Sequence, residues 1–141
     1  MDNETIAEGI RIFARDVGAK LSRPDELMFE AAFPGEPYPH FIGIEMFGTM
    51  LSYTGYSGVI PNISWAPLLL KKNWGGVGDT CFYSSVHFQD NQPWHVLETR
   101  QNIDSKSTPA EIASNLKWLK HQLTIAREAI EASQTGETPE P

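Results

Sequence analysis

The 141-residue chain contains a single cysteine, Cys81. An internal disulfide is therefore excluded, and so are zinc motifs built from several cysteines. The sequence also lacks any apolar run close to the roughly 20 residues that span a bilayer. Its first residues, Met1-Asp2-Asn3-Glu4, are acidic where a secretory signal peptide is basic. Together these absences predict a cytoplasmic protein that does not bind a membrane.

Basic residues are scarce. Eleven lysines and arginines stand against 18 aspartates and glutamates, which gives a formal net charge of −7. A surface of this sign repels the phosphates of nucleic acids and of anionic lipids, so we do not expect a nucleic-acid partner. The same charge suits a partner protein that carries a basic segment.

The length and the hydrophobic content of 40% suit one domain with a core of its own. Residues 133–141 hold no apolar side chain and include two prolines and two glutamates. A segment of this composition cannot bury enough apolar surface to fold. We therefore expect a single domain over residues 1–132 and a disordered acidic tail over 133–141.

The strongest local signal is a long helix near the carboxyl end. Thr108-Pro109-Ala110-Glu111 is a capping box with proline in the first helical position. In this box the Thr108 hydroxyl accepts from one free backbone N–H, and the Glu111 carboxylate reaches back to another. Behind it, apolar residues recur three and four positions apart and form one stripe, which must be buried: Ile112, Leu116, Leu119, Leu123, Ala126 and Ile130.

The rest of the chain predicts strands between helices. A helical period over residues 3–21 opens the chain, with Gly18 as a candidate helix end, and a short helix is expected over 64–75. The expected strands cover residues 27–33, 41–47, 50–53, 79–88 and 94–103. The fold class is therefore α+β, with an antiparallel sheet of about five strands, N-terminal and C-terminal helices packed on it, and a short middle helix.

Two histidines of the last hairpin form the sharpest candidate site. His87 and His95 are equidistant from Asn91. In a hairpin symmetric about Asn91 they would face each other with Cβ atoms ~5 Å apart, close enough to share a metal or a proton. A one-residue change of register would separate them. This gives the alternative hypothesis of a small-molecule or metal-binding protein, with Tyr83 or Trp94 nearby.

Other chemical motifs are incomplete. The glycine-rich segment 75–80 lacks the lysine and hydroxyl order of a phosphate-binding loop, since Lys71 and Lys72 precede it. Cys81 lies within an expected strand, where cysteine commonly acts as a small buried hydrophobe. Because no catalytic signature is complete, we expect a protein that is not an enzyme and that needs no cofactor or metal.

The tryptophans are the best candidates for contacting a partner. Trp65 and Trp74 flank the expected short helix, and Trp94 opens a strand. Trp118 lies off the main apolar stripe of the last helix. Aromatic residues with a polar tip are common in core packing, and they are also enriched in interfaces. All four are predicted partner-binding residues.

The order of elements resembles the type III secretion chaperone-like fold, including the YbjN-like family of bacterial proteins. Leu68-Leu69-Leu70-Lys71-Lys72-Asn73 looks like the short middle helix of that family, and the segments 81–88 and 95–103 look like its later strands. Residues 108–132 look like its closing amphipathic helix. The resemblance implies a non-enzymatic, chaperone-like or regulatory binding module, often a homodimer, whose sheet or C-terminal helix holds an extended partner segment. A purely structural role within a larger assembly is a third hypothesis.

Overall fold

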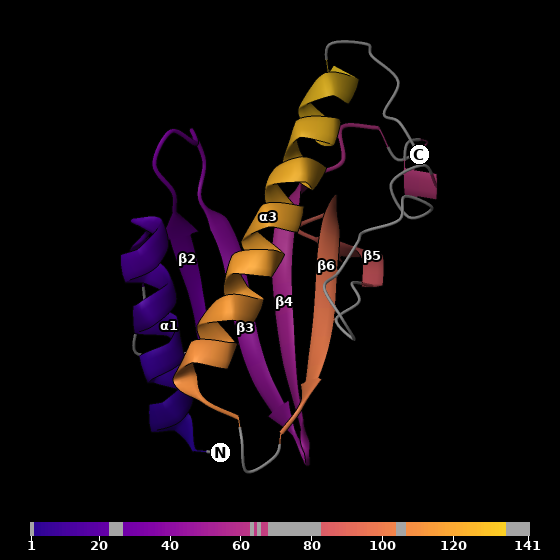
Figure 1. Ribbon diagram of the computed structural model, residues 1–141. Coiled ribbons are helices and arrows are strands. Elements are labelled where there is room, and N and C mark those ends of the chain that lie inside the picture. Colours follow the sequence, from indigo (N-terminus) through magenta and orange to yellow (C-terminus); the bar gives the residue numbers. More distant parts are fainter. Residues whose placement is uncertain are drawn as a thin grey trace.

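The computed structural model describes residues 2–22, 27–62, 64, 66–67, 83–103 and 107–134. In this part of the chain two helices, α1 and α3, pack on one face of a six-stranded antiparallel sheet (Figure 1). The predicted α+β class and the packing of the N-terminal and C-terminal helices on the sheet are confirmed. Neither helix combines the length and the apolar character that a membrane-spanning helix needs.

Helix α1 (Asn3–Val17) is defined by its two caps. The Asp2 carboxylate accepts from the Thr5 backbone N–H at 2.9 Å and satisfies one of the unpaired donors of the first turn. Gly18 adopts a left-handed conformation with φ 68°, and its N–H bonds to the carbonyl of Ala14. The helix therefore ends just before Gly18, the candidate end that the sequence offered, and not at residue 21. Glycine suits this position because the left-handed conformation is unfavourable for residues with a Cβ.

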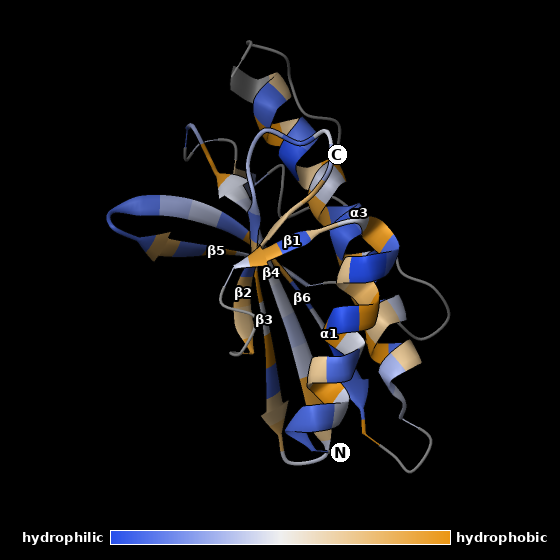
Figure 2. Ribbon diagram, turned by 90° about the vertical axis from the view of Figure 1, so that its left-hand side faces the viewer, coloured by the Kyte–Doolittle hydropathy of each residue, from blue (hydrophilic) through white to orange (hydrophobic). Residues whose placement is uncertain are grey.

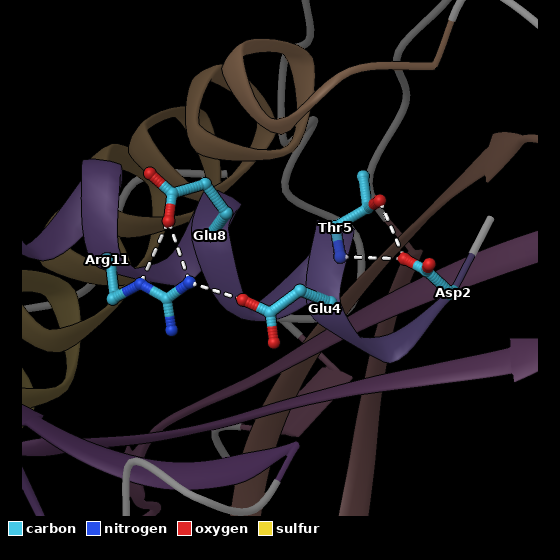
Figure 3. Close-up of polar contacts among 5 residues, drawn as sticks. All are labelled: Asp2, Glu4, Thr5, Glu8 and Arg11. Atoms are coloured by element: carbon cyan, nitrogen blue, oxygen red, sulfur yellow. Dashed lines mark hydrogen bonds and ion pairs between the residues drawn. The ribbon is translucent and has the colours of Figure 1, made fainter.

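The outward side of α1 is charged. Arg11 donates to Glu4, two turns earlier, at 2.8 Å and to Glu8, one turn earlier, at 2.7 Å (Figure 3). Such exposed pairs contribute little stability each, but they mark the side of the helix that faces water. The opposite side carries the buried residues Ile6, Gly9, Ile10 and Phe13.

Helix α3 (Pro109–Gln134) is the long helix that the sequence predicted, and it crosses the sheet diagonally (Figure 1). The Thr108 hydroxyl accepts from the Glu111 N–H at 3.3 Å, as the capping box requires. The Glu111 carboxylate itself accepts from the Gln101 side chain at 3.3 Å and so links the helix to the sheet. The whole predicted stripe from Ile112 to Ile130 is buried. The helix ends two residues past the boundary expected at residue 132.

Glycines allow the close packing of the helices. A Cβ on Gly9 of α1 would lie 2.6 Å from the Ile112 side chain of α3. A Cβ on Gly55, in the sheet, would lie 2.6 Å from Leu123 of α3. Real Cβ atoms do not approach side chains this closely, so both contacts depend on the absence of a side chain. The Lys117 ammonium also pairs with Asp16 at 2.8 Å across the two helices.

The six strands pair antiparallel throughout, in the spatial order β1-β2-β3-β4-β6-β5. Their bounds are β1 Lys20–Ser22, β2 Met28–Ala32, β3 His40–Phe47, β4 Met50–Val59, β5 Tyr83–Gln89 and β6 Gln92–Asn102.

Two strands differ from the prediction. β1 was missed because residues 20 and 21 were assigned to the end of the first helix. β4 continues to Val59, beyond the predicted end at residue 53, because Gly55 and Gly58 lie within the strand and do not end it. Gly55 makes room for Leu123, and Gly58 lies where the register between β4 and β6 shifts. The expected short helix over 64–75 falls almost wholly outside the described residues.

The β5–β6 hairpin has a two-residue turn, shorter than the loop 89–93 that the sequence suggested. Asp90 and Asn91 both have positive φ, 54° and 61°. This is the conformation of the tight turns whose twist matches paired strands, and asparagine and aspartate tolerate it best. The centre of the hairpin therefore lies between Asp90 and Asn91, which changes every cross-strand pair.

The sheet has two unlike faces. One packs on α1 and α3 and supplies the core, and the view along the sheet shows both helices on that side (Figure 2). We call the other face the outer face. Its side chains alternate with the core residues along each strand, as the pleat of a sheet requires.

Candidate functional site

An aromatic cluster centred on Tyr56 occupies the outer face. The Tyr56 ring meets the rings of Phe41, His87 and Trp94 edge-on, at centroid distances of 5.8, 6.1 and 6.0 Å. The four residues come from β3, β4, β5 and β6, so the cluster exists only when the sheet is assembled. Edge-to-face packing of this kind holds the rings in fixed positions and leaves flat apolar surface beside them.

Hollows lie beside this cluster. One, with a cavity volume of about 280 Å³, is bounded by Tyr56, His87 and Met28. A larger one of about 400 Å³ lies next to Phe41 and Trp94. Further along the same face, a hollow of about 230 Å³ is bounded by Phe47, Met50, Ser52 and Arg100. Phe47 and Met28, 58% and 48% exposed, add apolar surface near the hollows.

Carboxylates surround the cluster. Pairing places Glu30 beside Phe41, Glu45 beside Ser52, and Glu98 beside Thr54 on the outer face. Over strands β2 to β6 the only lysine or arginine is Arg100, which pairs with Glu98 at 2.9 Å. Lys20 lies at the far edge, in β1. The outer face is therefore apolar at its centre and acidic around it, which suits a basic partner better than an acidic one.

The predicted juxtaposition of His87 and His95 is wrong. The hairpin pairs His87 with Trp94 and Val86 with His95, so the two histidines point to opposite faces. The cause is the two-residue turn, because a shift of one position exchanges the faces of a strand. Among the described residues no group of three or more His, Cys, Asp or Glu side chains is placed to hold a metal ion.

His95 is instead buried on the helix side, between two serine hydroxyls. Ser57 Oγ lies 2.6 Å from His95 Nδ1 and donates to the His95 carbonyl at 2.9 Å. A hydroxyl has one proton, so Nδ1 must donate to Ser57, and Nε2 is left to accept from Ser84 Oγ at 2.6 Å. Burial lowers the pKa of His95 to about 4.

The Ser84–His95 contact has the shape of a nucleophile beside a base, but its electrostatics do not suit catalysis. A general base works best with a pKa near the working pH, and the pKa of His95 is well below neutrality. The group that holds Nδ1 is a neutral hydroxyl, whereas a catalytic triad uses a carboxylate to stabilise the imidazolium. We assign the three side chains to holding the end of β4 against β6 and β5.

A second polar group fixes the loop between β2 and β3 to α3. Arg127 donates to the carbonyls of Ser57, Tyr38 and Pro39 at 2.7, 3.1 and 3.4 Å. Nearby, buried His40 donates through Nδ1 to the Tyr56 carbonyl at 3.1 Å. Burial lowers the pKa of both Arg127 and His40. These bonds set the wall of the larger hollow.

Of the four predicted tryptophans the structure describes Trp94 and Trp118, and these two lie in different layers. Trp94 belongs to the outer-face cluster. Trp118 is in the helix layer, where it packs against the core and stacks on His121 at 5.4 Å. Trp65 and Trp74 lie outside the described residues, as do Cys81 and the segment 75–80. Sequence reasoning missed Tyr56 and Phe41, and only their place in alternating strands could have indicated a shared face.

The fold matches the crystal structure of YbjN, a proposed transcription regulator from E. coli, with a TM-score of 0.57. The match covers 90% of this chain and 90% of that chain. The chain has the YbjN-like fold. Sequence identity to YbjN is 15%, so the likeness concerns the fold alone. No protein-family model and no curated protein sequence matches the chain. The predicted resemblance to the YbjN-like fold is confirmed.

Proposed function

We propose that the protein is a non-enzymatic binding module that holds an extended, basic segment of a partner protein across the outer face of its sheet. The observation that carries this proposal is the Tyr56-centred aromatic cluster with carboxylates around it. Interfaces favour aromatic residues at their centre and charged residues at their rim, and this surface has that arrangement.

The shape of the surface favours an extended segment. Hollows on both sides of Tyr56 lie along the face, and a peptide strand places alternate side chains on one side. Apolar side chains would enter beside the rings, while lysines or arginines would reach Glu45 and Glu98. The acidic net charge of −7 would steer such a segment toward the protein.

Two observations support binding over catalysis. His95, which contacts a serine hydroxyl as a catalytic base would, stays neutral because burial lowers its pKa to about 4. YbjN, which shares the fold, is itself described as a proposed regulator. A regulatory or chaperone-like role requires a surface that recognises another chain, and the outer face offers one.

A charge-reversal experiment tests the proposal. The probe is the peptide acetyl-Lys-Val-Thr-Arg-Thr-Val-Lys-amide, and its affinity is measured by calorimetry. We expect Glu45→Lys combined with Glu98→Lys to weaken binding about tenfold or more. Glu128→Lys, an exposed change on α3, is the matched control and should have a small effect. Equal losses in both variants, or no loss in either, would reject the outer face as the site.

A homodimer, which the resemblance also predicts, is a separate proposal. Two copies meeting through their outer faces would bring Glu30, Glu45 and Glu98 of each chain together, so we expect a dimer to use another surface. Light scattering of the wild type and of the charge-reversal variant tests this. A dimer that forms only in the wild type would make a second copy the occupant of the outer face.

A further inference from the structure

The larger hollow continues the outer face toward the end of α3. It has a volume of about 400 Å³, within the range of protein ligand pockets. Tyr38, Phe41 and Trp94 give it aromatic walls, and Glu30, Arg127 and Glu131 give it charge. It therefore combines flat apolar surface with charged groups of both signs.

The positive charge in this pocket already has partners. The three backbone carbonyls of Ser57, Tyr38 and Pro39 accept from Arg127, one from each of its side-chain nitrogens. Its guanidinium also lies over the Tyr38 ring, 5.9 Å from the centroid. The guanidinium keeps its positive charge, which the nearby Glu36 and Glu131 carboxylates attract, and its three bonds to carbonyls fix it as part of the wall.

The negative charges remain available. Glu30 extends from β2 and Glu131 from α3, and both side chains are exposed. Within the described residues no basic side chain makes a direct ion pair with either carboxylate. Two carboxylates against one guanidinium leave the lining with a net negative charge, so the pocket favours a cation.

We infer that this pocket binds the side chain of an arginine from the partner segment. The inference rests on the proposed function and adds to it the residue that anchors the segment. A guanidinium is planar and weakly hydrated, so it stacks on Trp94 or Phe41 while its N–H groups reach Glu30 or Glu131. A lysine ammonium is compact and strongly hydrated, and it gains less from aromatic walls.

The experiment compares three versions of one peptide that differ only in the central residue. Acetyl-Lys-Val-Thr-Arg-Thr-Val-Lys-amide is titrated beside versions with citrulline, which keeps the shape but is neutral, and with lysine. N-acetylarginine amide is a fragment probe, followed through the nuclear magnetic resonance signal of the Trp94 indole N–H. Each titration is repeated on Glu30→Gln combined with Glu131→Gln, and on Glu128→Gln as control. All three substitutions are at exposed positions, and circular dichroism verifies folding.

We expect the arginine peptide to bind about tenfold more tightly than the citrulline peptide to the wild type and to Glu128→Gln. In the Glu30→Gln and Glu131→Gln variant this advantage should fall to about twofold or less. Equal affinities for arginine and citrulline, or for arginine and lysine, would overturn the inference. If all three peptides bind with equal affinity, and only the Glu45→Lys and Glu98→Lys variant binds them more weakly, the proposed function stands without the arginine pocket. If no peptide and no fragment binds, both fail.

Discussion

Ser57 and His95 hold each other through two contacts, one between the hydroxyl and Nδ1 at 2.6 Å and one from the hydroxyl to the His95 carbonyl at 2.9 Å. The pair lies where the register between β4 and β6 shifts. The Ser57 hydroxyl uses its one proton to donate to the His95 carbonyl, so at Nδ1 it acts as the acceptor and Nδ1 carries a proton. In the neutral ring Nδ1 then donates and Nε2 accepts, and both nitrogens have a partner. A charged ring would have to donate from Nε2 to Ser84 Oγ, so the Ser84 proton would need another acceptor and the positive charge would be buried. The histidine is therefore a neutral structural element.

This arrangement predicts that stability falls in mild acid. The unfolded chain binds a proton at His95 near pH 6.5, whereas the folded chain binds it near pH 4, so lowering the pH across this interval favours unfolding. The loss approaches about 3 kcal/mol at pH 4 for a shift of this size. Urea unfolding at pH 7 and at pH 4.5 measures it.

Two variants separate this effect from other titrations. His95→Gln should unfold at lower urea overall but with a weaker dependence on pH. His87→Gln, an exposed change in the same hairpin, should keep the full dependence. His40 acts in the same direction as His95, because burial lowers its pKa too, so some dependence will remain in His95→Gln. An unchanged pH dependence in His95→Gln would contradict the assignment.

A second prediction concerns how closely α3 approaches β4. Gly55→Ala places a Cβ 2.6 Å from Leu123, and we expect it to destabilise the protein by about 1–3 kcal/mol because α3 must move outward. Gly43→Ala is the matched control. Its Cβ would lie 3.3 Å from the flexible Met28 side chain and 3.9 Å from the Leu27 carbonyl oxygen, so the cost should be smaller. Thermal unfolding of both variants provides the comparison.

A double variant verifies the cause. In a Leu123→Ala background the space beside Gly55 is free, so Gly55→Ala should cost much less than in the wild type. The coupling between the two sites should be about 1 kcal/mol or more. Simple additivity would mean that the loss comes from the strand backbone and not from the contact with α3.

The elements that could be predicted from the sequence are those with local signals. The Thr108 cap and the stripe from Ile112 to Ile130 indicate α3 because a helix places both within a few turns. The β-branched and aromatic content of the segments likewise predicted most strands. β1 was missed because Lys20–Ser22 is too short to show a period of its own.

The candidate site was less predictable because it depends on distant pairing. Trp94 was identified as a partner-binding residue, but its neighbours Tyr56 and Phe41 join it only through pairing across β3, β4 and β6. The His87–His95 hypothesis failed for a similar reason. A turn of Asp90 and Asn91 moves the hairpin centre by half a residue, and that small change decides which side chains meet.

A third prediction follows from the contacts of Arg127. Arg127→Met keeps much of the side-chain length but removes the donors to three carbonyls. We expect a loss of about 2 kcal/mol, since hydrogen bonds to charged groups are among the stronger ones. Within the loop over residues 34–39, hydrogen exchange should speed up at the Glu36 amide, which donates to the Phe33 carbonyl, while α1 keeps its protection. Arg15→Met, at an exposed arginine of α1, should leave the exchange of this loop unchanged. Slow exchange of the loop in Arg127→Met would show that the loop is held by other contacts.

In the proposed function the outer face, and not the helix layer, contacts the partner segment. The most direct test is nuclear magnetic resonance mapping of the wild-type protein titrated with acetyl-Lys-Val-Thr-Arg-Thr-Val-Lys-amide. We expect shifts at Tyr56, His87 and Trp94, with little change at outward residues of α1 such as Arg11. Shifts confined to α1 and α3, or a spectrum that does not respond to the peptide, would contradict the proposed function.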